Sequence, residues 1–404
     1  MSNAAWKIYM LAIVSFLVGT SENIIAGILD KVAADVGVSV AAAGQLITVF
    51  SLAYAFGTPI LMAITARMER SKLMMTALGL FVIGNAVSVL ASGYIPLMAA
   101  RVLLAISTGV FVVVALTVAA KMAEPGKQGS AIATLVMGFS TSLIVGVPVG
   151  RVIASTYDWK LIFAGIGILG LLAMFAIYKM IPKSEGEAPI PIRDQVNLLK
   201  SPRIALALAV TFFWIFGYSI IYTYISPYLL TVTGMSERTV SISLFAFGLA
   251  SLIGSKLGGF STDRLGTGRT LIGGMLMHSG ILFLLASFSF SAWFVFPLLM
   301  LWAFSAWSSG PTQQFYLLSL APEASGIMLS VNTSVLQLAF AAGAGVGGYV
   351  VNNVSLSSVG WLGAILVGVA ALLSAISLGV TANYAKVVER RSRLSAKEAE
   401  VSSY

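Results

Sequence analysis

Long apolar runs alternate with short polar stretches along most of the chain. A helix that crosses a bilayer needs about 20 predominantly apolar residues, and the sequence offers twelve runs of this kind. Turn-forming and charged residues separate these runs. The pattern therefore predicts helices at 5–29, 38–64, 73–92, 96–120, 127–152, 160–181, 202–230, 237–261, 270–288, 292–316, 325–350 and 358–382.

One polar stretch, residues 182–201, is longer than the others and combines prolines with mixed charges, which is typical of a solvated linker. It divides the chain into a six-helix half at 1–181 and a second six-helix half at 202–385. The polar residues 386–404 are expected to form a disordered tail that begins near Ala385. We predict an all-α membrane protein with twelve transmembrane helices in two pseudo-symmetric halves around a central cavity.

The composition excludes several other classes of protein. Hydrophobic residues make up 58% of the chain and charged residues only 10%, whereas a soluble protein has about 25% charged residues. The absence of cysteine excludes disulfides and thiolate metal sites, and the single histidine, His278, cannot form a zinc site alone. No phosphate-binding loop motif and no nucleophile–base pair is present. We therefore expect neither an enzyme nor a cofactor, and no use of ATP.

The positive charges lie mostly on one side of the predicted membrane. With a cytoplasmic N-terminus, 19 of the 24 Lys and Arg residues fall in cytoplasmic segments, four fall outside, and Arg101 lies within a helix. This bias predicts that both termini are cytoplasmic. It also accounts for the net charge of +9 through contact with an anionic bilayer, so nucleic acid is not an expected partner. The apolar run after Lys7 is interpreted as a retained first helix rather than a signal peptide.

A single carboxylate, Glu22, interrupts the predicted apolar helix 5–29. Placing a charge at the centre of a bilayer costs about 2.5–3.5 kcal/mol on insertion scales, so this side chain should face the interior of the bundle. There it could bind and release a proton as the cavity opens to either side, or be a structural carboxylate held by a neighbour. Arg101 could attract ionised Glu22 and release the neutral form, or it could extend to the membrane interface.

Aromatic and amide side chains are the candidates for a substrate cavity. Aromatic rings stack on planar bases, and amides can offer a donor and an acceptor to the edge of a purine. The alternative for the aromatic residues is a belt at the membrane interface. His278 could relay protons, although a packed, hydrogen-bonded histidine is the plainer interpretation. The predicted cavity residues are Asn23, Gln45, Trp214, Tyr218, Tyr222, Trp302, Trp307, Gln313, Gln314, Asn332 and Gln337.

Two short basic turns occupy the same place in each half. The turn at 258–269, GGFSTDRLGTGR, resembles the loop signature of the major facilitator superfamily, and ARMERSK at 66–72 resembles a degenerate copy of it. Opposite charges in the second turn could hold the inner face closed, or they could serve only as membrane anchors. The residues that match the signature are Gly259, Asp263, Arg264, Gly266 and Arg269.

The fifth predicted helix contains MGFSTSLIVGVPVGR, which resembles the antiporter motif of drug:proton exporters in that superfamily. Gly138, Gly146, Pro148 and Gly150 carry the resemblance. It implies a bend between the halves that limits leak, with tight helix packing as the alternative. Arg101 matches the arginine of the superfamily's motif in the fourth helix.

Several longer stretches, among them AAGQLITVFSLAYAFGTPILMAITARMER and WSSGPTQQFYLLSLAP, resemble bacterial purine-base efflux pumps of the PbuE type. GTSEN and YTYISPYL are similar to arabinose and sugar efflux permeases. The resemblance implies a monomeric exporter in the bacterial inner membrane, driven by proton entry, with purine bases or nucleosides as the first choice of substrate. Sugars or drugs such as chloramphenicol are the alternatives. A facilitator without proton coupling and a membrane sensor without net flux also stay open.

Overall fold

The computed structural model describes residues 3–124, 127–181, 199–288 and 291–402, and these residues form helices and short connections. Twelve helical spans in this part of the chain are long and apolar enough to cross a membrane, which confirms the predicted all-α, twelve-helix architecture. The helices of the N-terminal half (the N-half) are α1 (Asn3–Gly27), α2 (Leu29–Asp35), α3 (Val40–Ile64), α4 (Arg70–Leu90), α5 (Tyr94–Met122), α6 (Gln128–Thr141), the π-helical segment η1 (Ser142–Gly146), α7 (Val147–Thr156) and α8 (Lys160–Met180).

The C-terminal half (the C-half) repeats this plan. The predicted linker lies largely outside the described residues. The C-half elements are α10 (Pro202–Tyr222), α11 (Ile225–Pro227), the π-helical segment η2 (Tyr228–Val232), α12 (Glu237–Leu265), α13 (Thr267–Ser287), α14 (Ala292–Leu320), the short η3 (Pro322–Ala324), α15 (Ser325–Asn353) and α16 (Ser358–Ser402).

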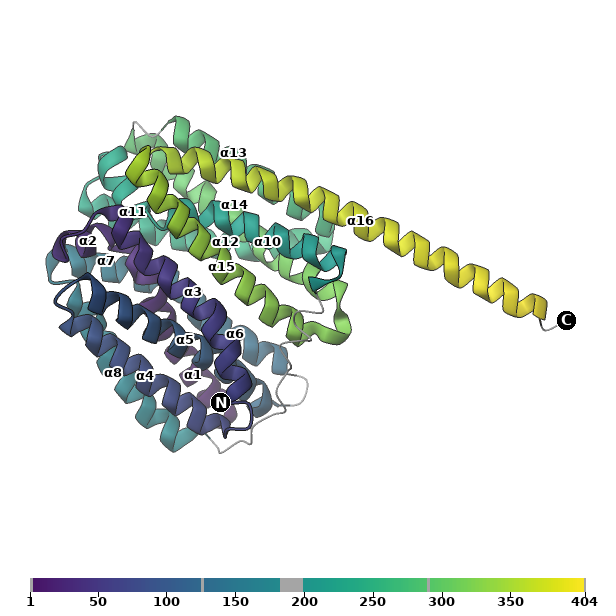
Figure 1. Cartoon of the computed structure of the whole chain (residues 1–404), viewed down its shortest axis with the longest axis horizontal. Helices are drawn as coiled ribbons and strands as arrows, with labels where there is room; N and C mark the ends of the chain where they lie inside the picture. The colour runs from purple at the N-terminus through teal and green to yellow at the C-terminus, as the bar shows by residue number, and fades with distance from the viewer. Residues whose placement is uncertain (1–2, 125–126, 182–198, 289–290, 403–404) are drawn as a thin grey trace.

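Each half has its own hydrophobic core. Figure 1 shows the helices of the two halves side by side. At the interface, α3 of the N-half packs against α15, η1 and α7 pack against α12, and α1 packs against α11. Ala26 and Val147 of the N-half join the core of the C-half, and Tyr224 of the C-half joins the core of the N-half. The halves are therefore distinct packing units that interlock at a few positions.

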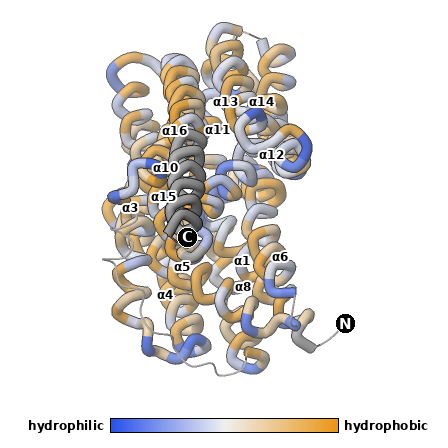
Figure 2. Tube along the Cα trace, turned by 90° about the vertical axis from the view of Figure 1, so that its right-hand side faces the viewer, coloured by the Kyte–Doolittle hydropathy of each residue, from blue (hydrophilic) through white to orange (hydrophobic). Residues whose placement is uncertain are grey.

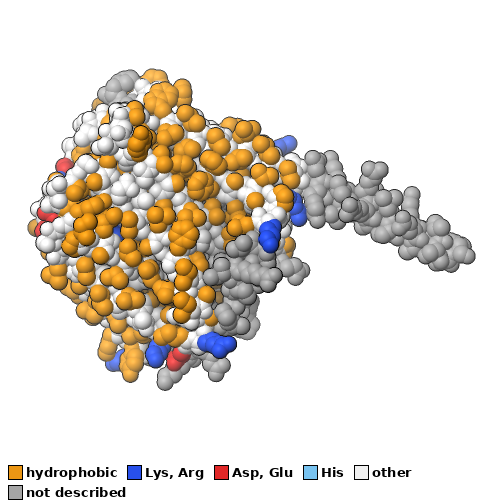
Figure 3. Space-filling view, viewed as in Figure 1, with side chains coloured by type: hydrophobic (Ala, Val, Ile, Leu, Met, Phe, Trp, Pro, Cys, Tyr) orange, Lys and Arg blue, Asp and Glu red, His pale blue; other side chains and the backbone are white. Residues whose placement is uncertain are grey.

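The outer surface is apolar over most of its area. Figure 2 shows hydrophobic residues along the length of the helices, and Figure 3 shows charged side chains mainly at the margins of the visible face. Exposed side chains such as Phe175, Leu172 and Ile253 lie in the middle of helices, where a soluble protein would carry polar residues. A surface of this kind faces lipid, so the chain is a multi-pass membrane protein.

The two ends of the bundle differ in their charges. The connections from α3 to α4, α5 to α6 and α12 to α13 lie at the end that also holds the N-terminus, and we call this the basic end. Figure 1 shows α2, α7 and α11 together at the other end, which we call the opposite end. Lys31, Arg151, Lys160 and Arg238 belong to the opposite end.

Several helix boundaries differ from the prediction by a few residues, and three of the differences have a clear physical reason. The predicted helix 202–230 breaks after Tyr222, because the ring of Pro227 is incompatible with a regular helix through the carbonyl four residues earlier. The first helix ends at Gly27, whose carbonyl oxygen accepts hydrogen bonds from the side chains of Arg151 and Ser226 instead of continuing the helix. The prediction of a disordered tail from Ala385 was wrong, since α16 continues to Ser402 through a segment rich in strong helix formers.

Candidate functional site

A cavity of about 400 Å³ lies between the two halves. Its lining comes from α1, α3, α5, α6 and η1 on one side and from α10, α12, α14 and α15 on the other. The cavity extends from the middle of the bundle toward the basic end, because most of its residues lie in the part of each helix nearest that end. Its polar and aromatic lining residues are Ser15, Glu22, Tyr54, Phe139, Ser140, Thr211, Trp214, Tyr218, Ser251, Ser255, Trp307, Gln313, Gln314, Asn332, Thr333, Gln337 and Phe340.

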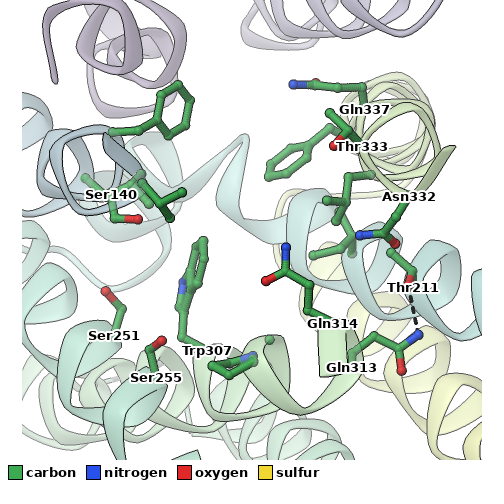
Figure 4. A pocket seen from close by; sticks show the side chains of 18 of the residues that line it. Ser140, Thr211, Ser251, Ser255, Trp307, Gln313, Gln314, Asn332, Thr333 and Gln337 are labelled. Carbon is green, nitrogen blue, oxygen red and sulfur yellow. Dashed lines mark hydrogen bonds between the residues drawn. The ribbon is translucent and has the colours of Figure 1, made fainter. Parts of the chain in front are cut away.

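Most of the amide groups come from α14 and α15. Figure 4 shows Gln314 and Asn332 on one side of the cavity, with Trp307 between them and the hydroxyl groups of Ser251 and Ser255. The side-chain oxygen of Asn332 is buried and has no hydrogen-bond partner among the described residues. Amide side chains can donate hydrogen bonds to a bound molecule and accept hydrogen bonds from it.

Gln313 has a different role from its neighbour Gln314. Its Nε2 donates to the carbonyl oxygen of Ala207 at 2.7 Å and to Oγ1 of Thr211 at 2.9 Å, so this amide joins α14 to α10 (Figure 4). Gln313 lines the cavity as predicted, but its donor groups are already engaged. Gln314 is exposed to the cavity, so its donor groups as well as its oxygen are available to a ligand, whereas Gln313 offers only its oxygen.

Glu22 faces the cavity, as the sequence predicted. Its Oε1 accepts a hydrogen bond of 3.0 Å from Nε2 of Gln337 on α15, and its Oε2 is buried without a partner among the described residues. The described lining of the cavity contains no other carboxylate and no Lys, Arg or His. The cavity therefore has one ionisable acid and no fixed positive charge on its wall.

Arg101 lies close to Glu22 but contacts its backbone rather than its carboxylate. The side chain is fully buried, which excludes the predicted alternative of an arginine at the membrane interface. Its guanidinium donates to the carbonyl oxygens of Ser21 at 2.9 Å and Glu22 at 3.2 Å, and it lies 4.2 Å from the ring centre of Phe50. Arg101 thus fixes the backbone of α1 around Glu22.

Four of the predicted aromatic residues, together with Asn23, line two different pockets. Trp214, Tyr218 and Trp307 line the cavity. Tyr222 and Asn23 instead line a much smaller pocket on the other side of Glu22, toward the opposite end of the bundle. The rings of Tyr218 and Tyr222 are stacked, with centres 5.1 Å apart, so one aromatic face continues from the cavity past the carboxylate.

Two further predicted cavity residues, Trp302 and Gln45, line neither of these pockets. Trp302 is fully buried in the core of the C-half, where its Nε1 donates to Nε2 of His278 at 2.8 Å. Trp302 and Trp307 are five positions apart, so the two side chains point to different faces of α14. Gln45 lies where α3 packs on α15, beside Gly348, and donates to the carbonyl oxygen of Ala41. His278 matches the plainer prediction of a packed, hydrogen-bonded histidine.

The glycines of the fifth predicted helix allow it to approach α1 closely. A Cβ atom added at Gly138 would overlap the backbone of Ala12, and one added at Gly146 or Gly150 would overlap the side chain of Thr20 or Ile24. The π-helical turn of η1 precedes Pro148 and accommodates a residue that cannot donate a backbone hydrogen bond. Both η1 and α7 also pack against α12, so this irregular segment lies between the halves.

The charged residues of the loop signature lie at the basic end, outside the ion pairs that the described part of the chain forms. Asp263, Arg264 and Arg269 are exposed at the basic end, and none of them forms an ion pair with a described residue. Arg264 instead lies over the ring of Phe260, 4.6 Å from its centre. The ion pairs that were predicted to hold the basic end closed are not formed among the described residues in this conformation.

Sequence reasoning missed a charge cluster at the opposite end. Arg151 is fully buried and bonds the carboxylates of Asp30 and Glu237, and Lys31 donates to Oε1 of Glu237 at 2.6 Å. The one available signal was an arginine that directly follows Gly150 within an apolar helix. In the described part of the chain, no group of three or more His, Cys, Asp or Glu residues could hold a metal ion.

The chain resembles known transporters over nearly its full length. Residues 11–344 match the family model described as Major Facilitator Superfamily. The chain is 55% identical over 374 residues to the "Uncharacterized MFS-type transporter YbcL" of Bacillus subtilis (strain 168), which covers 93% of this chain and 96% of the relative. It is 30% identical to the "Inner membrane transport protein YdhP" of Escherichia coli (strain K12), with 91% and 95% covered, and 26% identical to a "Probable sugar efflux transporter" of Helicobacter acinonychis (strain Sheeba), with 90% and 93% covered.

Solved structures share the fold at low sequence identity. A bacterial homologue of the human lysosomal transporter Spinster, in an inward-facing and occupied conformation, superposes with a TM-score of 0.76 at 16% identity and covers 93% of this chain and 97% of its own. A D-xylose–proton symporter gives a TM-score of 0.76 at 16% identity, with 92% and 97% covered. At this level of identity the likeness supports the twelve-helix fold alone.

Proposed function

Because the chain belongs to the major facilitator superfamily and is a membrane transporter rather than an enzyme, we propose that it exports small molecules from the cytoplasm in exchange for protons. The observation that carries the proposal is the single carboxylate, Glu22, on the wall of a cavity between two separately packed halves. Intramembrane acids of this kind are expensive and commonly mark proton or substrate pathways.

The coupling would operate through the contact between the halves. Glu22 belongs to α1 of the N-half, and the amide that bonds it, Gln337, belongs to α15 of the C-half. Ionised Glu22 accepts a charge-assisted hydrogen bond from Gln337, and protonation weakens that bond by removing the charge. The proton on Glu22 would therefore alter the balance between two arrangements of the halves, which is what coupling requires.

The energy available is sufficient for useful export. One elementary charge that crosses a potential of 100 mV releases about 2.3 kcal/mol, and a tenfold gradient costs about 1.4 kcal/mol. One proton could thus sustain a roughly 50-fold gradient of a neutral substrate. We place the basic end in the cytoplasm of a bacterial cell, following the bias of positive charge, and the cavity described here then faces inward.

Purine bases or nucleosides are our first choice of substrate. Trp214, Tyr218 and Trp307 offer aromatic surfaces, and stacking on such surfaces contributes about 1–3 kcal/mol per base. Gln314 and Asn332 offer amide groups to the polar edge of a planar heterocycle. The lack of a cationic side chain on the described wall disfavours anionic substrates such as nucleotides.

Sugars are the second candidate, and amphipathic drugs the third. The hydroxyl groups of Ser140, Ser251 and Ser255 form a polar wall opposite the amides, which suits a molecule with many hydroxyl groups (Figure 4). The name of one relative, a probable sugar efflux transporter, points the same way. The large apolar share of the lining, which includes Leu143 and Phe340, suits a drug such as chloramphenicol.

Everted membrane vesicles that contain the protein test the proposal directly. Radiolabelled hypoxanthine, arabinose and chloramphenicol would be offered in parallel under an imposed pH gradient, with vesicles that lack the protein as the control. We expect hypoxanthine to accumulate and the accumulation to collapse with a protonophore. Accumulation of arabinose or chloramphenicol instead would overturn the purine assignment, and accumulation that survives the protonophore would overturn proton coupling.

A further inference from the structure

The opposite end of the bundle is joined across the two halves by charged side chains. Arg151, on α7 of the N-half, bonds the carboxylate of Asp30 in its own half and the carboxylate of Glu237 at the start of α12 in the C-half. Lys31 of the N-half donates to the other oxygen of Glu237 at 2.6 Å. Glu237 thus uses both of its carboxylate oxygens on cations of the other half.

The burial of Arg151 makes this cluster different from an ordinary surface ion pair. Its side chain has an exposed fraction of 0%, and its guanidinium also donates to the carbonyl oxygen of Gly27 at 3.1 Å. Removing a partner from a buried charge is strongly destabilising, whereas exposed pairs contribute little. The cluster therefore favours the conformation in which this end is closed.

The backbone around the cluster is built from helix ends rather than continuous helices. α1 ends at Gly27, and the break after α10 brings Ser226 of the C-half to the same carbonyl oxygen, to which its Oγ donates at 2.7 Å. Polar contacts thus join the two halves at this end, and water can replace them when the halves separate. Apolar surfaces that interlock over the same area would oppose opening more strongly.

We propose that Arg151, Asp30, Lys31 and Glu237 form a gate that closes the cavity at the opposite end and that its contacts between the halves break once in each transport cycle. In this conformation the gate is formed, whereas Asp263 and Arg269 at the basic end have no ion-pair partner among the described residues. The proposal requires that the protein transports by alternating access, but it requires neither purine as the substrate nor a proton on Glu22.

The same end of the molecule provides a matched control. Lys160 at the start of α8 and Asp35 at the end of α2 form an ion pair of 3.4 Å, and both belong to the N-half. Breaking this pair removes an ion pair at the same end of the bundle without releasing one half from the other. An effect of gating should therefore follow loss of Glu237 and not loss of Asp35.

The natural absence of cysteine allows a test that does not depend on the substrate. Thr223 is buried and lines the small pocket between the gate and Glu22, so Thr223→Cys introduces one thiol behind the gate. In right-side-out vesicles, an external membrane-impermeant maleimide should label this thiol slowly. Adding Glu237→Gln should raise the labelling rate about fivefold or more, while adding Asp35→Asn should leave it unchanged.

Lys31→Gln provides a second variant if Glu237→Gln does not accumulate in the membrane. It removes one contact between the halves and leaves both carboxylates bonded to Arg151, so a smaller rise in the labelling rate is expected. The proposal is overturned if loss of the contacts of Glu237 or Lys31 leaves labelling at the parent rate. It is also overturned if Asp35→Asn raises the rate equally.

Discussion

Gln337 and Glu22 form a hydrogen bond of 3.0 Å between residues that are 315 positions apart in the chain. One belongs to the C-half and the other to the N-half, and they meet at the cavity. The acid that we propose to gain and lose a proton during transport, Glu22, therefore takes part directly in a contact between the halves. The first two predictions concern the two partners of this bond.

Glu22→Gln should abolish accumulation against a gradient while leaving downhill movement of substrate. The neutral amide occupies nearly the same volume but cannot bind and release a proton at cellular pH. The expected accumulation ratio in everted vesicles falls from tens of times the outside concentration to about one. Asp35→Asn, a matched change far from the cavity, should keep the ratio of the parent protein. Full accumulation by Glu22→Gln would contradict the role assigned to this residue.

Gln337→Met should weaken coupled export while preserving the shape of the cavity wall. A hydrogen bond to a charged group contributes about 1.5–3 kcal/mol, so a decrease of roughly tenfold or more in coupled export rate is expected. Gln45→Met is the control, since Gln45 lies outside the cavity between α3 and α15. Equal losses in the two variants, measured as initial rates of proton-driven uptake, would argue that Gln337 has only a packing role.

Trp307 and Trp302 should respond differently to substitution although both belong to α14. Trp307→Leu removes an aromatic surface from the cavity and should raise the KM for a purine about tenfold, with a smaller effect on stability. Trp302→Phe leaves Nε2 of His278 buried without its donor and should lower the free energy of unfolding by about 1–3 kcal/mol, with KM unchanged. Transport kinetics and thermal unfolding in detergent distinguish an effect on substrate binding from an effect on stability. A raised KM in Trp302→Phe but not in Trp307→Leu would contradict the roles assigned to the two residues.

Gly138→Ala should destabilise the protein because the added methyl group would overlap the backbone of Ala12 on α1. Overpacking of this kind typically costs about 1–3 kcal/mol. Gly165→Ala on α8 is the matched control, since an added Cβ there meets no atom within 4 Å. The control should be neutral or slightly stabilising, because alanine favours a helix over glycine. Identical melting temperatures for the two variants would show that α6 and α1 can separate at low cost.

The twelve helices could be predicted because lipid imposes a simple rule on the sequence. Each crossing must be long, apolar and internally hydrogen-bonded, so the hydropathy pattern alone locates it. Glu22 could be predicted for the same reason, since a lone acid in such a run must face inward. The break after Tyr222 was missed because the effect of Pro227 was underestimated beside a strong apolar signal.

The charge cluster at the opposite end could not be predicted in this way. The charged residues of this cluster lie near the ends of predicted helices: Asp30, Arg151 and Glu237. A charge at such a position is expected at the membrane surface, so the positions of these residues give no sign of a buried cluster. Only the packing of α7 against α12 shows that Arg151 is buried and that its partners come from both halves. Trp302 and Trp307 were equivalent cavity candidates in the sequence. Their positions around the α14 helix place Trp307 in the cavity and Trp302 in the core of the C-half.

The central claim is that the protein exchanges substrate for a proton carried by Glu22. Measuring proton movement that accompanies substrate entry tests this claim most directly. Purified protein would be reconstituted into liposomes that contain a trapped pH-sensitive dye, and hypoxanthine would be added outside. We predict that entry of hypoxanthine raises the internal pH as protons leave, and that Glu22→Gln admits hypoxanthine without any change in pH. Entry of hypoxanthine at constant internal pH through the wild-type protein, or an equal rise in pH through Glu22→Gln, would contradict the claim.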